Sequence, residues 1–255
     1  MRFFTTIGQW VVYLIAEMGR MGIFMAYALS LTFRRPYRIR HIINEMRFIG
    51  VHSIVIILLT AGFTGMVIGL QGYYTLRQFG SEAMLGSGVA LALVRELGPV
   101  LGSLMVTARA GSAMAAELGI MRISEQIDAL DVMTINPMKF LVQPKIIAGI
   151  LSMPLLTGIF DVIGIYGGYL VGVKLLGVNE GSFYHNMYAS VVWRDVYSGF
   201  IKSLAFGTVL TWICCYKGYT CSHGAKGVGR ATTEAVVVSS VVILVADYFL
   251  TSILF

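Results

Sequence analysis

Charged residues are scarce in this chain of 255 residues. Asp, Glu, Lys and Arg make up 13% of it, whereas the residues AVILMFWYC make up 57%, with 29 glycines besides. A typical soluble domain is about 25% charged, so too few charges remain here to cover a surface exposed to water. The apolar content likewise excludes intrinsic disorder. The chain is therefore expected to be an integral membrane protein that forms one compact bundle.

Cysteine is also rare, with three residues at Cys214, Cys215 and Cys221. An odd number of cysteines without CxxC spacing argues against a disulfide scaffold and against a zinc site. We expect these three side chains to be reduced and to serve in packing.

Catalytic motifs are missing. The segment 224–227 imitates a Walker A motif but lacks the GxxxxGK[ST] spacing, so the chain is not expected to hydrolyse ATP by that route. GxSxG and HExxH motifs are absent, and the four histidines are scattered along the sequence. The sequence predicts a protein that is not an enzyme, with no cofactor and no metal.

Long apolar runs, by contrast, are abundant. A membrane-spanning helix needs about 20 mostly apolar residues. The run 83–118 is too long for one straight span, and Pro99 is expected to kink it or to end a half-helix near Leu97. Five spans are predicted, at about 48–76, 83–118, 146–173, 196–216 and 233–255.

The first 33 residues form a different kind of segment. Glu17 and Arg20 interrupt their apolar character, which makes a span or a signal peptide a poor fit. Apolar residues recur there at spacings of three and four, which predicts an amphipathic helix lying in the inner membrane interface. The basic cluster 34–40 would then lie at anionic headgroups. The predicted apolar stripe consists of Phe3, Ile7, Trp10, Val11, Leu14, Met18, Met21 and Met25.

The distribution of Lys and Arg predicts the orientation. Segment 1–47 holds seven of the 19 cationic residues, and the loops 119–145 and 217–232 hold three each. Such residues collect on the cytoplasmic side of membrane proteins. The N-terminus is therefore expected inside and, after five spans, the C-terminus outside.

Glycines recur at a spacing of four within three of the predicted spans. GxxxG arrangements allow the backbones of membrane helices to approach closely. They predict tight contacts within or between subunits, and they occur at Gly65/Gly69, Gly98/Gly102 and Gly164/Gly168/Gly172.

Charges within the spans are costly in lipid and are expected to face the protein interior, a partner or a cavity. Arg95 and Glu96 are adjacent, so on a helix they point about 100° apart, and each needs another partner, either across a dimer or at a headgroup. For Asp161 and Asp247 we favour polar contacts between helices over a role in substrate binding. Lys202 is expected to extend outward to the membrane interface.

The segment 119–136 carries an acidic cluster on the predicted basic side. Ser124 is expected to cap a short helix at about 122–133, with Glu125 and Asp128 near its positive end. Ile127, Leu130 and Met133 would form its apolar stripe. Such a helix between two spans is suited to dock into a groove on a soluble partner. The alternative, a helix lying on the membrane, is disfavoured because acidic residues are repelled by the anionic inner leaflet.

The run from Ala108 to Leu130 closely resembles the signature of MlaE/YrbE-type ABC permeases. Further matches follow in the order of that family, and the resemblance covers about residues 45–255. One departure is Lys145, where the family often has arginine; the charge is retained. The other matching segments are 69–73, 93–100, 136–137 with 144–145, 153–156 and 227–233.

The resemblance implies an all-α integral membrane fold with five transmembrane helices, an N-terminal interfacial helix and a short cytoplasmic coupling helix. Residues 1–47 would form the interfacial and elbow helices, and residues 48–255 the five-span permease domain. The implied function is that of a permease subunit that moves phospholipid between the inner membrane and a periplasmic MCE carrier, maintaining the lipid asymmetry of the outer membrane. The implied partners are a second copy of the chain, a cytoplasmic ABC ATPase dimer, a STAS-domain subunit and a periplasmic hexamer of MCE domains. The implied location is the inner membrane of a Gram-negative bacterium.

Two groups of site residues follow from the pattern and the resemblance together. The predicted coupling helix would contact the ATPase, with Glu125 and Asp128 as polar anchors. The outer halves of the first two spans would supply the lipid cavity, where Arg95 and Glu96 lie beside a headgroup. The coupling residues are Arg122, Glu125, Gln126, Asp128 and Leu130, and the lipid-cavity residues are Ile68, Leu76, Arg95, Glu96 and Leu97.

Alternative functions remain at this point. An ion-coupled secondary carrier would use Glu96, Asp161 and Asp247, but five unequal spans do not divide into the two inverted halves that such carriers often have. An intramembrane enzyme would need a nucleophile and a base, which the sequence does not pair. A third alternative is the permease of another MCE system that carries a different lipid.

Overall fold

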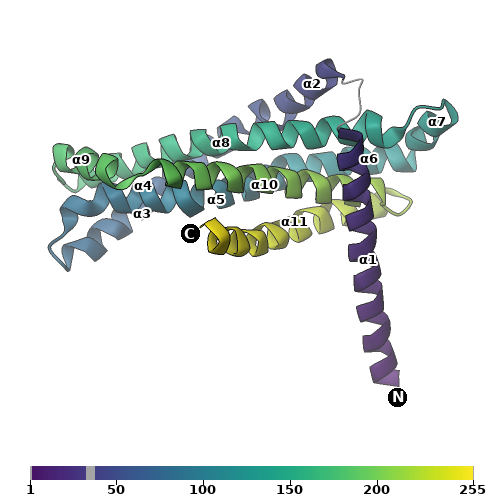
Figure 1. The fold of residues 1–255 in the computed structure, drawn as a ribbon, viewed down its shortest axis with the longest axis horizontal. Helices are drawn as coiled ribbons and strands as arrows, with labels where there is room; N and C mark the ends of the chain where they lie inside the picture. Colours follow the sequence, from purple (N-terminus) through teal and green to yellow (C-terminus); the bar gives the residue numbers. More distant parts are fainter. Residues whose placement is uncertain (1, 33–37, 255) are drawn as a thin grey trace.

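The computed structural model describes residues 2–32 and 38–254. Over these residues it holds five helical segments that are long and apolar enough to cross a membrane. They run alongside one another in an elongated bundle, with the N-terminal helix projecting from one end (Figure 1). The predicted all-α membrane fold with five spans is thus confirmed. The segments are Ile39–Arg77, Glu82–Ile123, Met138–Leu175, Trp193–Tyr219 and Ala225–Leu254.

The first segment is divided by a change of direction. It consists of α2 (Ile39–Ile49), a short 3-10 turn η1 (Val51–Ser53) and α3 (Ile54–Arg77). The helix α2 lies almost wholly within residues 1–47, where interfacial and elbow helices were expected, and the span predicted from residue 48 begins in its last turn. Figure 1 shows α2 leaning away from the long axis of the bundle.

The second segment is one continuous helical stretch. It runs through η2 (Glu82–Met84), α4 (Leu85–Ala92), η3 (Leu93–Leu97), α5 (Gly98–Val106), η4 (Thr107–Gly111) and α6 (Ser112–Ile123). The prediction that a half-helix ends near Leu97 is wrong. The π-helical turn η3 ends directly before Gly98 and Pro99, and its wider hydrogen-bond pattern accommodates a residue that has no N–H to donate. The irregularity therefore lies where a kink was predicted, but the helix continues through it.

The remaining spans follow the predicted runs. After α7 (Gln126–Val132) come η5 (Met138–Val142), α8 (Gln143–Tyr169) and η6 (Leu170–Leu175), where η5 and η6 are again π-helical. A short helix α9 (Glu180–Ser190) precedes α10 (Trp193–Tyr219) and α11 (Ala225–Leu254). The Asn179 side chain caps α9 by accepting a hydrogen bond from the Ser182 N–H.

Glycines bring α3 and α8 into close contact, as their spacing predicted. A Cβ atom on Gly65 would collide with the Gly164 backbone, and one on Gly69 would lie 3.0 Å from the Gly168 Cα. The contact is therefore made between two helices of the same subunit. Any side chain at Gly65 would push α3 away from α8.

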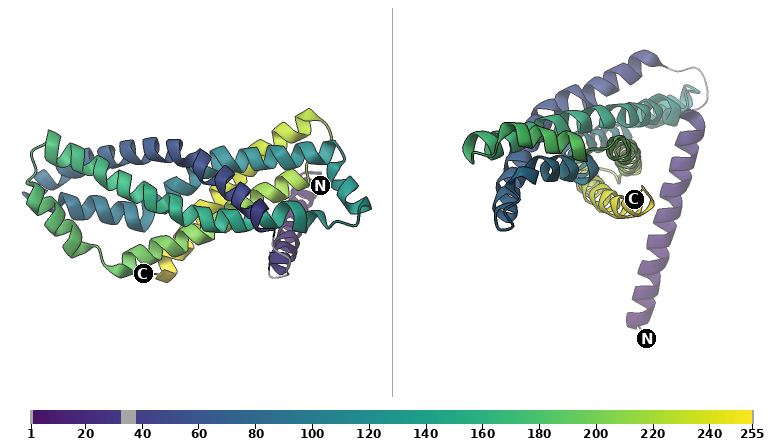
Figure 2. Two further views of the ribbon diagram at one scale, coloured as in Figure 1. Left: turned by 90° about the horizontal axis from the view of Figure 1, so that it is seen from above. Right: turned by 60° about the vertical axis from the view of Figure 1, so that its left-hand side comes forward.

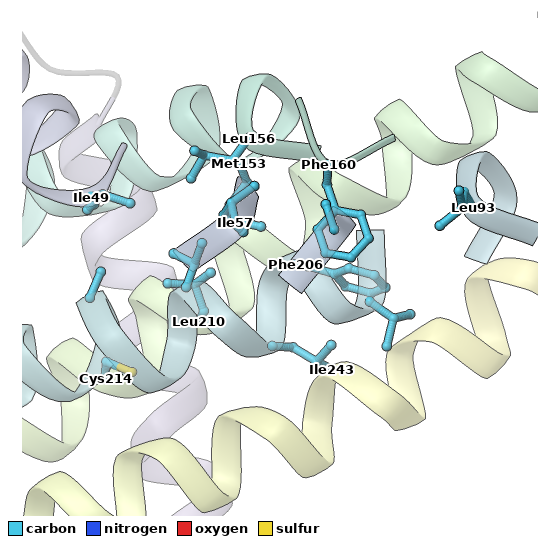
Figure 3. Close-up of a cluster of buried hydrophobic side chains, with 14 of the residues drawn as sticks. Ile49, Ile57, Leu93, Met153, Leu156, Phe160, Phe206, Leu210, Cys214 and Ile243 are labelled. Atoms are coloured by element: carbon cyan, nitrogen blue, oxygen red, sulfur yellow. The ribbon is translucent and has the colours of Figure 1, made fainter. Parts of the chain in front are cut away.

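The core fills the space between α3, α8, α10 and α11. Figure 3 shows Phe160 and Phe206 close together there, with Ile57 and Ile243 near them. All four side chains are fully buried. Cys214 and Cys215 are buried as well, which agrees with their expected role in packing, whereas Cys221 is half-buried.

The helix α1 (Arg2–Thr32) projects across the direction of the spans (Figures 1 and 2). Its second half is attached to the bundle. The Trp212 Nε1–H donates to the Met21 carbonyl at 2.9 Å, and the Phe24 ring contacts the Tyr216 ring at 5.4 Å. This direction agrees with the predicted interfacial helix, whose place in the membrane stays a prediction. Of the predicted stripe, Met21 is buried and Met18 is exposed. Residues 33–37, with most of the predicted basic cluster, lie outside the described residues.

The loops alternate between the two ends of the bundle. The attached half of α1, α7 and the start of α11 lie at one end, whereas the turn between α3 and α4 lies with α9 at the other (Figure 1). This grouping agrees with the predicted assignment of loops to two sides. Which side is cytoplasmic stays a prediction.

Candidate functional site

The predicted coupling helix is shorter than expected and begins later. The helix α7 covers Gln126–Val132, so Arg122 belongs to the last turn of α6 instead. The prediction that Ser124 caps this helix is wrong, because the Ser124 hydroxyl donates to the Ile120 carbonyl and ends α6. Glu125 takes the capping position of α7, and its side chain makes no capping hydrogen bond.

Left-handed residues bracket α7 on both sides. Glu125 has a φ of 57° and Thr134 a φ of 61°. Positive φ is uncommon for residues other than glycine, and for a β-branched residue such as threonine it is an outlier that the surrounding structure must enforce. Each residue turns the chain sharply, so α7 is presented at the tip of the bundle (Figure 1).

One face of α7 is turned away from the rest of the chain. Ile127 is fully buried against the bundle and Leu130 is half-buried, so of the predicted apolar stripe only Met133 is exposed. Val132 and Met133 are instead 85% and 65% exposed. We call the exposed residues Glu125, Gln126, Asp128, Val132 and Met133 the α7 face.

Arg122 and Asp128 of the predicted coupling group contact each other. The Arg122 guanidinium donates to the Asp128 carboxylate, and both side chains are at least one-third exposed. This pair links the end of α6 to α7. Glu125 is the carboxylate of the α7 face that is not part of this pair.

A buried lysine lies near this end of the molecule. The Lys145 ammonium, at the start of α8, lies 2.9 Å from Glu45 Oε1 of α2 and 2.7 Å from Glu117 Oε2 of α6. Its side chain is 2% exposed. We call these three residues the Lys145 junction. Lys145 was expected only as a departure from the family pattern. The available signal for a site here was a cation directly after Pro144 at the start of an apolar run.

Arg109 joins the same region from η4. Its guanidinium donates to the Phe48 carbonyl and lies 5.0 Å from the centre of the Phe48 ring. The Lys145 ammonium is 5.9 Å from the centre of that ring. Two cations thus contact the end of α2, where the chain turns into α3.

A second buried lysine lies in the opposite half of the bundle. The Lys202 side chain of α10 is fully buried, so the prediction that it extends outward is wrong. Its ammonium donates to the Glu96 carboxylate of η3, lies 2.9 Å from Asp247 Oδ1 of α11, and bonds the Thr251 hydroxyl. A polar contact between helices is therefore confirmed for Asp247. We call Lys202, Glu96, Asp247 and Thr251 the Lys202 cluster.

Arg95 has a partner of its own. Its Nη2 lies 2.8 Å from Asp195 Oδ1, at the beginning of α10. Arg95 and Glu96 thus each have a separate partner, as expected, and both partners belong to α10 of the same chain. A contact of either group with a headgroup stays a prediction. Asp195 was not among the predicted site residues, because its spacing of 100 residues from Arg95 carries no periodic signal.

Asp161 differs from the other intramembrane carboxylates. Its Oδ1 is buried and makes no hydrogen bond with any of the residues that the structure describes, so the expected polar contact is not formed. It lies against Gly98, where a Cβ atom would collide with it. The three carboxylates of the ion-carrier alternative are therefore not arranged alike, since Glu96 and Asp247 both contact Lys202.

The apolar residues of the predicted lipid cavity lie at two depths. Ile68 is nine residues before the end of α3 and Leu97 is twelve after the start of α4. At 1.5 Å per residue this is roughly 14 and 18 Å from the helix ends. Leu76 lies in the last turn of α3, nearer to the loop. All three are half-buried and pack against the main core.

Comparison with known proteins agrees with this architecture. A family model described as "Permease MlaE" matches residues 42–253. The chain is 42% identical to the intermembrane phospholipid transport system permease protein MlaE of Haemophilus influenzae, over 99% of this chain and 97% of the relative. It is 43% identical to a probable ABC transporter permease protein of Rickettsia bellii, over 98% and 96% of the two chains.

A more distant relative comes from a plant. The protein TRIGALACTOSYLDIACYLGLYCEROL 1, chloroplastic, of Arabidopsis thaliana is 37% identical over 85% of this chain and 62% of the relative. The family match covers all five spans and α7. The chain therefore belongs to the MlaE permease family, as a non-catalytic membrane subunit of an ABC transporter.

Proposed function

We propose that the chain is the permease through which an ABC transporter moves phospholipid out of or into the membrane. The observation that carries this proposal is α7, an exposed helix that sharp turns hold between two spans at one end of the bundle. The relative of this chain from Haemophilus influenzae is named for intermembrane phospholipid transport, and the chain matches it along almost its whole length. The family name alone does not place the contact with the ATPase, and the exposed position of α7 between two sharp turns supports assigning the contact to it.

The α7 face has the composition of a docking surface. Val132 and Met133 provide an apolar centre, and Glu125, Gln126 and Asp128 provide a polar rim. Interfaces with soluble partners commonly combine an apolar core with such a rim. We assign this face to the ATPase subunit that supplies ATP hydrolysis.

The residues that we propose contact lipid lie in the other half of the bundle. Ile68 and Leu97 offer half-exposed apolar side chains at similar depth, and Arg95 and Glu96 are more than one-third exposed. An apolar wall beside a charged group suits an acyl chain and its headgroup. The contacts of Arg95 and Glu96 with α10 support a fixed position for these charges.

The remaining features are proposals from the family resemblance. The N-terminus and the α7 end would face the cytoplasm and the C-terminus the periplasm, in a Gram-negative inner membrane. A second copy of the chain, a STAS-domain subunit and a hexameric MCE ring would complete the transporter. The excess of Lys and Arg in the segments at the α7 end supports this orientation.

The test uses the full chain in vesicles of phosphatidylethanolamine and phosphatidylglycerol. We expect an ABC ATPase to co-purify with the native chain and ATP to drive transfer of labelled phospholipid to an MCE-domain acceptor. Val132→Asp together with Met133→Asp should abolish co-purification while leaving the chain inserted, because two charges would enter the apolar centre of the interface.

The matched control is Tyr188→Asp, at an exposed position of α9 near the other end of the bundle. It should retain the ATPase. Loss of the ATPase from neither variant would contradict the role of α7. Transfer of a sterol but not of phospholipid by the native complex would favour the permease of another MCE system.

A further inference from the structure

The Lys145 junction connects three helices that flank the proposed ATPase contact. Glu117 belongs to α6, which leads into α7, whereas Lys145 belongs to α8, which follows it. Glu45 belongs to α2, the leaning helix before the first span. Both ion pairs are made by a single ammonium group, with N–O distances of 2.9 and 2.7 Å.

The burial of this ammonium determines how firmly it is held. With 2% of its side chain exposed, Lys145 has little water to replace a lost carboxylate. Moving either glutamate away would leave a desolvated charge, which is costly in a buried site. A movement of α6 is therefore opposed unless α2 and α8 move with it.

Arg109 strengthens the connection at the turn between α2 and α3. It donates to the Phe48 carbonyl, and it also lies 3.5 Å from the Ser53 hydroxyl. Phe48 is thus contacted by Arg109 from η4 and by Lys145 from α8. The helices α2, α6 and α8 form one connected unit at this end.

We propose that Lys145 is a positioning residue that carries movement of α6 and α7 to α2, so that these helices move as one body when the ATPase acts. This inference rests on the proposed function, because α7 moves only if an ATPase pulls on it. It goes further by naming the residue through which that movement reaches the first span.

The experiment measures distances between spin labels in the complete transporter in phospholipid nanodiscs, with and without a non-hydrolysable ATP analogue. Labels at Ile43→Cys on α2 and Ile120→Cys on α6 occupy exposed positions. A reference pair, Ile120→Cys and Val241→Cys, reports movement of α6 relative to α11. The three native cysteines are first replaced by alanine or serine.

The variant combines Lys145→Met with Glu45→Gln and Glu117→Gln, which removes the junction without leaving a buried charge. Lys145→Arg, which keeps the charge, is the matched control. In the native chain and in Lys145→Arg, we expect the analogue to shift the reference pair by about 2 Å or more and to leave the Ile43–Ile120 pair unchanged. In the triple variant, the Ile43–Ile120 distance should shift by a similar amount.

Transport provides a second measurement. The triple variant should bind the ATPase with unchanged affinity and retain the KM for ATP, while lipid transfer falls roughly ten- to a hundredfold. If Lys145 had a purely structural role, the triple variant would give less folded complex. In the complex that did fold, the Ile43–Ile120 distance would respond to the analogue as it does in the native chain.

Three outcomes would overturn the inference: a shift of the Ile43–Ile120 pair in the native chain, no shift in the triple variant, or an unmoved reference pair in the native chain. Failure of the native chain to bind any ATPase would contradict the proposed function itself. The two failures are therefore distinguishable.

Discussion

The two halves of the bundle each contain a buried lysine held by carboxylates from two other helices, but their surroundings differ. Lys145 contacts glutamates from α2 and α6, and Arg109 lies 5.0 Å from the centre of the Phe48 ring that Lys145 also contacts. Lys202 contacts Glu96 and Asp247 and adds the Thr251 hydroxyl, joining η3 to α10 and α11. The ion pairs of Lys145 include one with α2, the helix that leans away from the bundle. The ion pairs of Lys202 join three membrane-spanning segments to one another. The same ion-pair chemistry thus serves a connection between moving parts at one end and a fixed core at the other.

Removing each lysine gives the most direct test of this contrast and the largest expected effect. Lys202→Met should destabilise the chain by about 3–5 kcal/mol, because a fully buried cation is lost and two carboxylates remain. Lys145→Met should cost less, roughly 1–3 kcal/mol, because Lys202 also donates to the Thr251 hydroxyl and the Arg95 carbonyl, which its loss would leave without that donor. Thermal unfolding in detergent measures both. Equal losses would contradict the proposed difference between the two sites.

A charge in the proposed lipid cavity should have the next largest effect. Leu97→Arg places a cation among half-buried apolar side chains, at a cost of about 2.5–3.5 kcal/mol near the middle of a membrane. We expect the amount of phospholipid that co-purifies with the chain to fall several-fold. Leu97→Met is the control that keeps the volume. Unchanged phospholipid content in Leu97→Arg would remove this residue from the cavity wall.

Reversing one charge on the α7 face should weaken binding of the ATPase and leave the chain itself unchanged. Glu125→Lys is expected to weaken ATPase binding by roughly tenfold, or about 1.4 kcal/mol, without altering membrane insertion. The matched control is Glu82→Lys, near the other end of the bundle in η2. Binding of the labelled ATPase to the chain in nanodiscs distinguishes them. Equal weakening by both substitutions would show a general charge effect and not a contact.

The smallest effect is expected for the exposed pair at the base of α7. Arg122→Ala and Asp128→Ala should each change the free energy of unfolding by about 1 kcal/mol or less, because both groups are solvated. Chemical denaturation measures this change. A much larger loss at this pair than at Lys145 would reverse the comparison between exposed and buried charges.

Much of the fold could be predicted from the sequence because apolar length and glycine spacing are local properties. The five spans, the packed cysteines and the contact of Gly65 and Gly69 with α8 all follow from such patterns. The start of α2 at Ile39 could not be placed in the same way, because its charged residues hide it from a search for apolar runs.

The partners in the ion pairs could not be predicted from the sequence, for a physical reason. Lys202 and Glu96 are 106 residues apart, and their meeting depends on how α10 packs against η3. The capping position of Glu125 could not be predicted either, because no sequence pattern indicates a left-handed φ at a residue other than glycine. Glu125, Gln126 and Asp128 are exposed and Leu130 is half-buried, and their contact with an ATPase stays a prediction. Val132, the most exposed apolar residue of α7, was not among the predicted residues.

The π-helical turns determine where the chain can lose a residue. Each such turn accommodates one residue more than the α-helix, whereas within a regular α-helix each residue advances the direction by about 100°. Deleting one residue within η3 would restore a regular helix and keep Gly98 against Asp161. Deleting one residue from α5 would instead rotate everything after the deletion relative to everything before it, so the residues leading to α7 would face other neighbours. Relatives should therefore vary in the number of residues along 93–97 more readily than along 98–106.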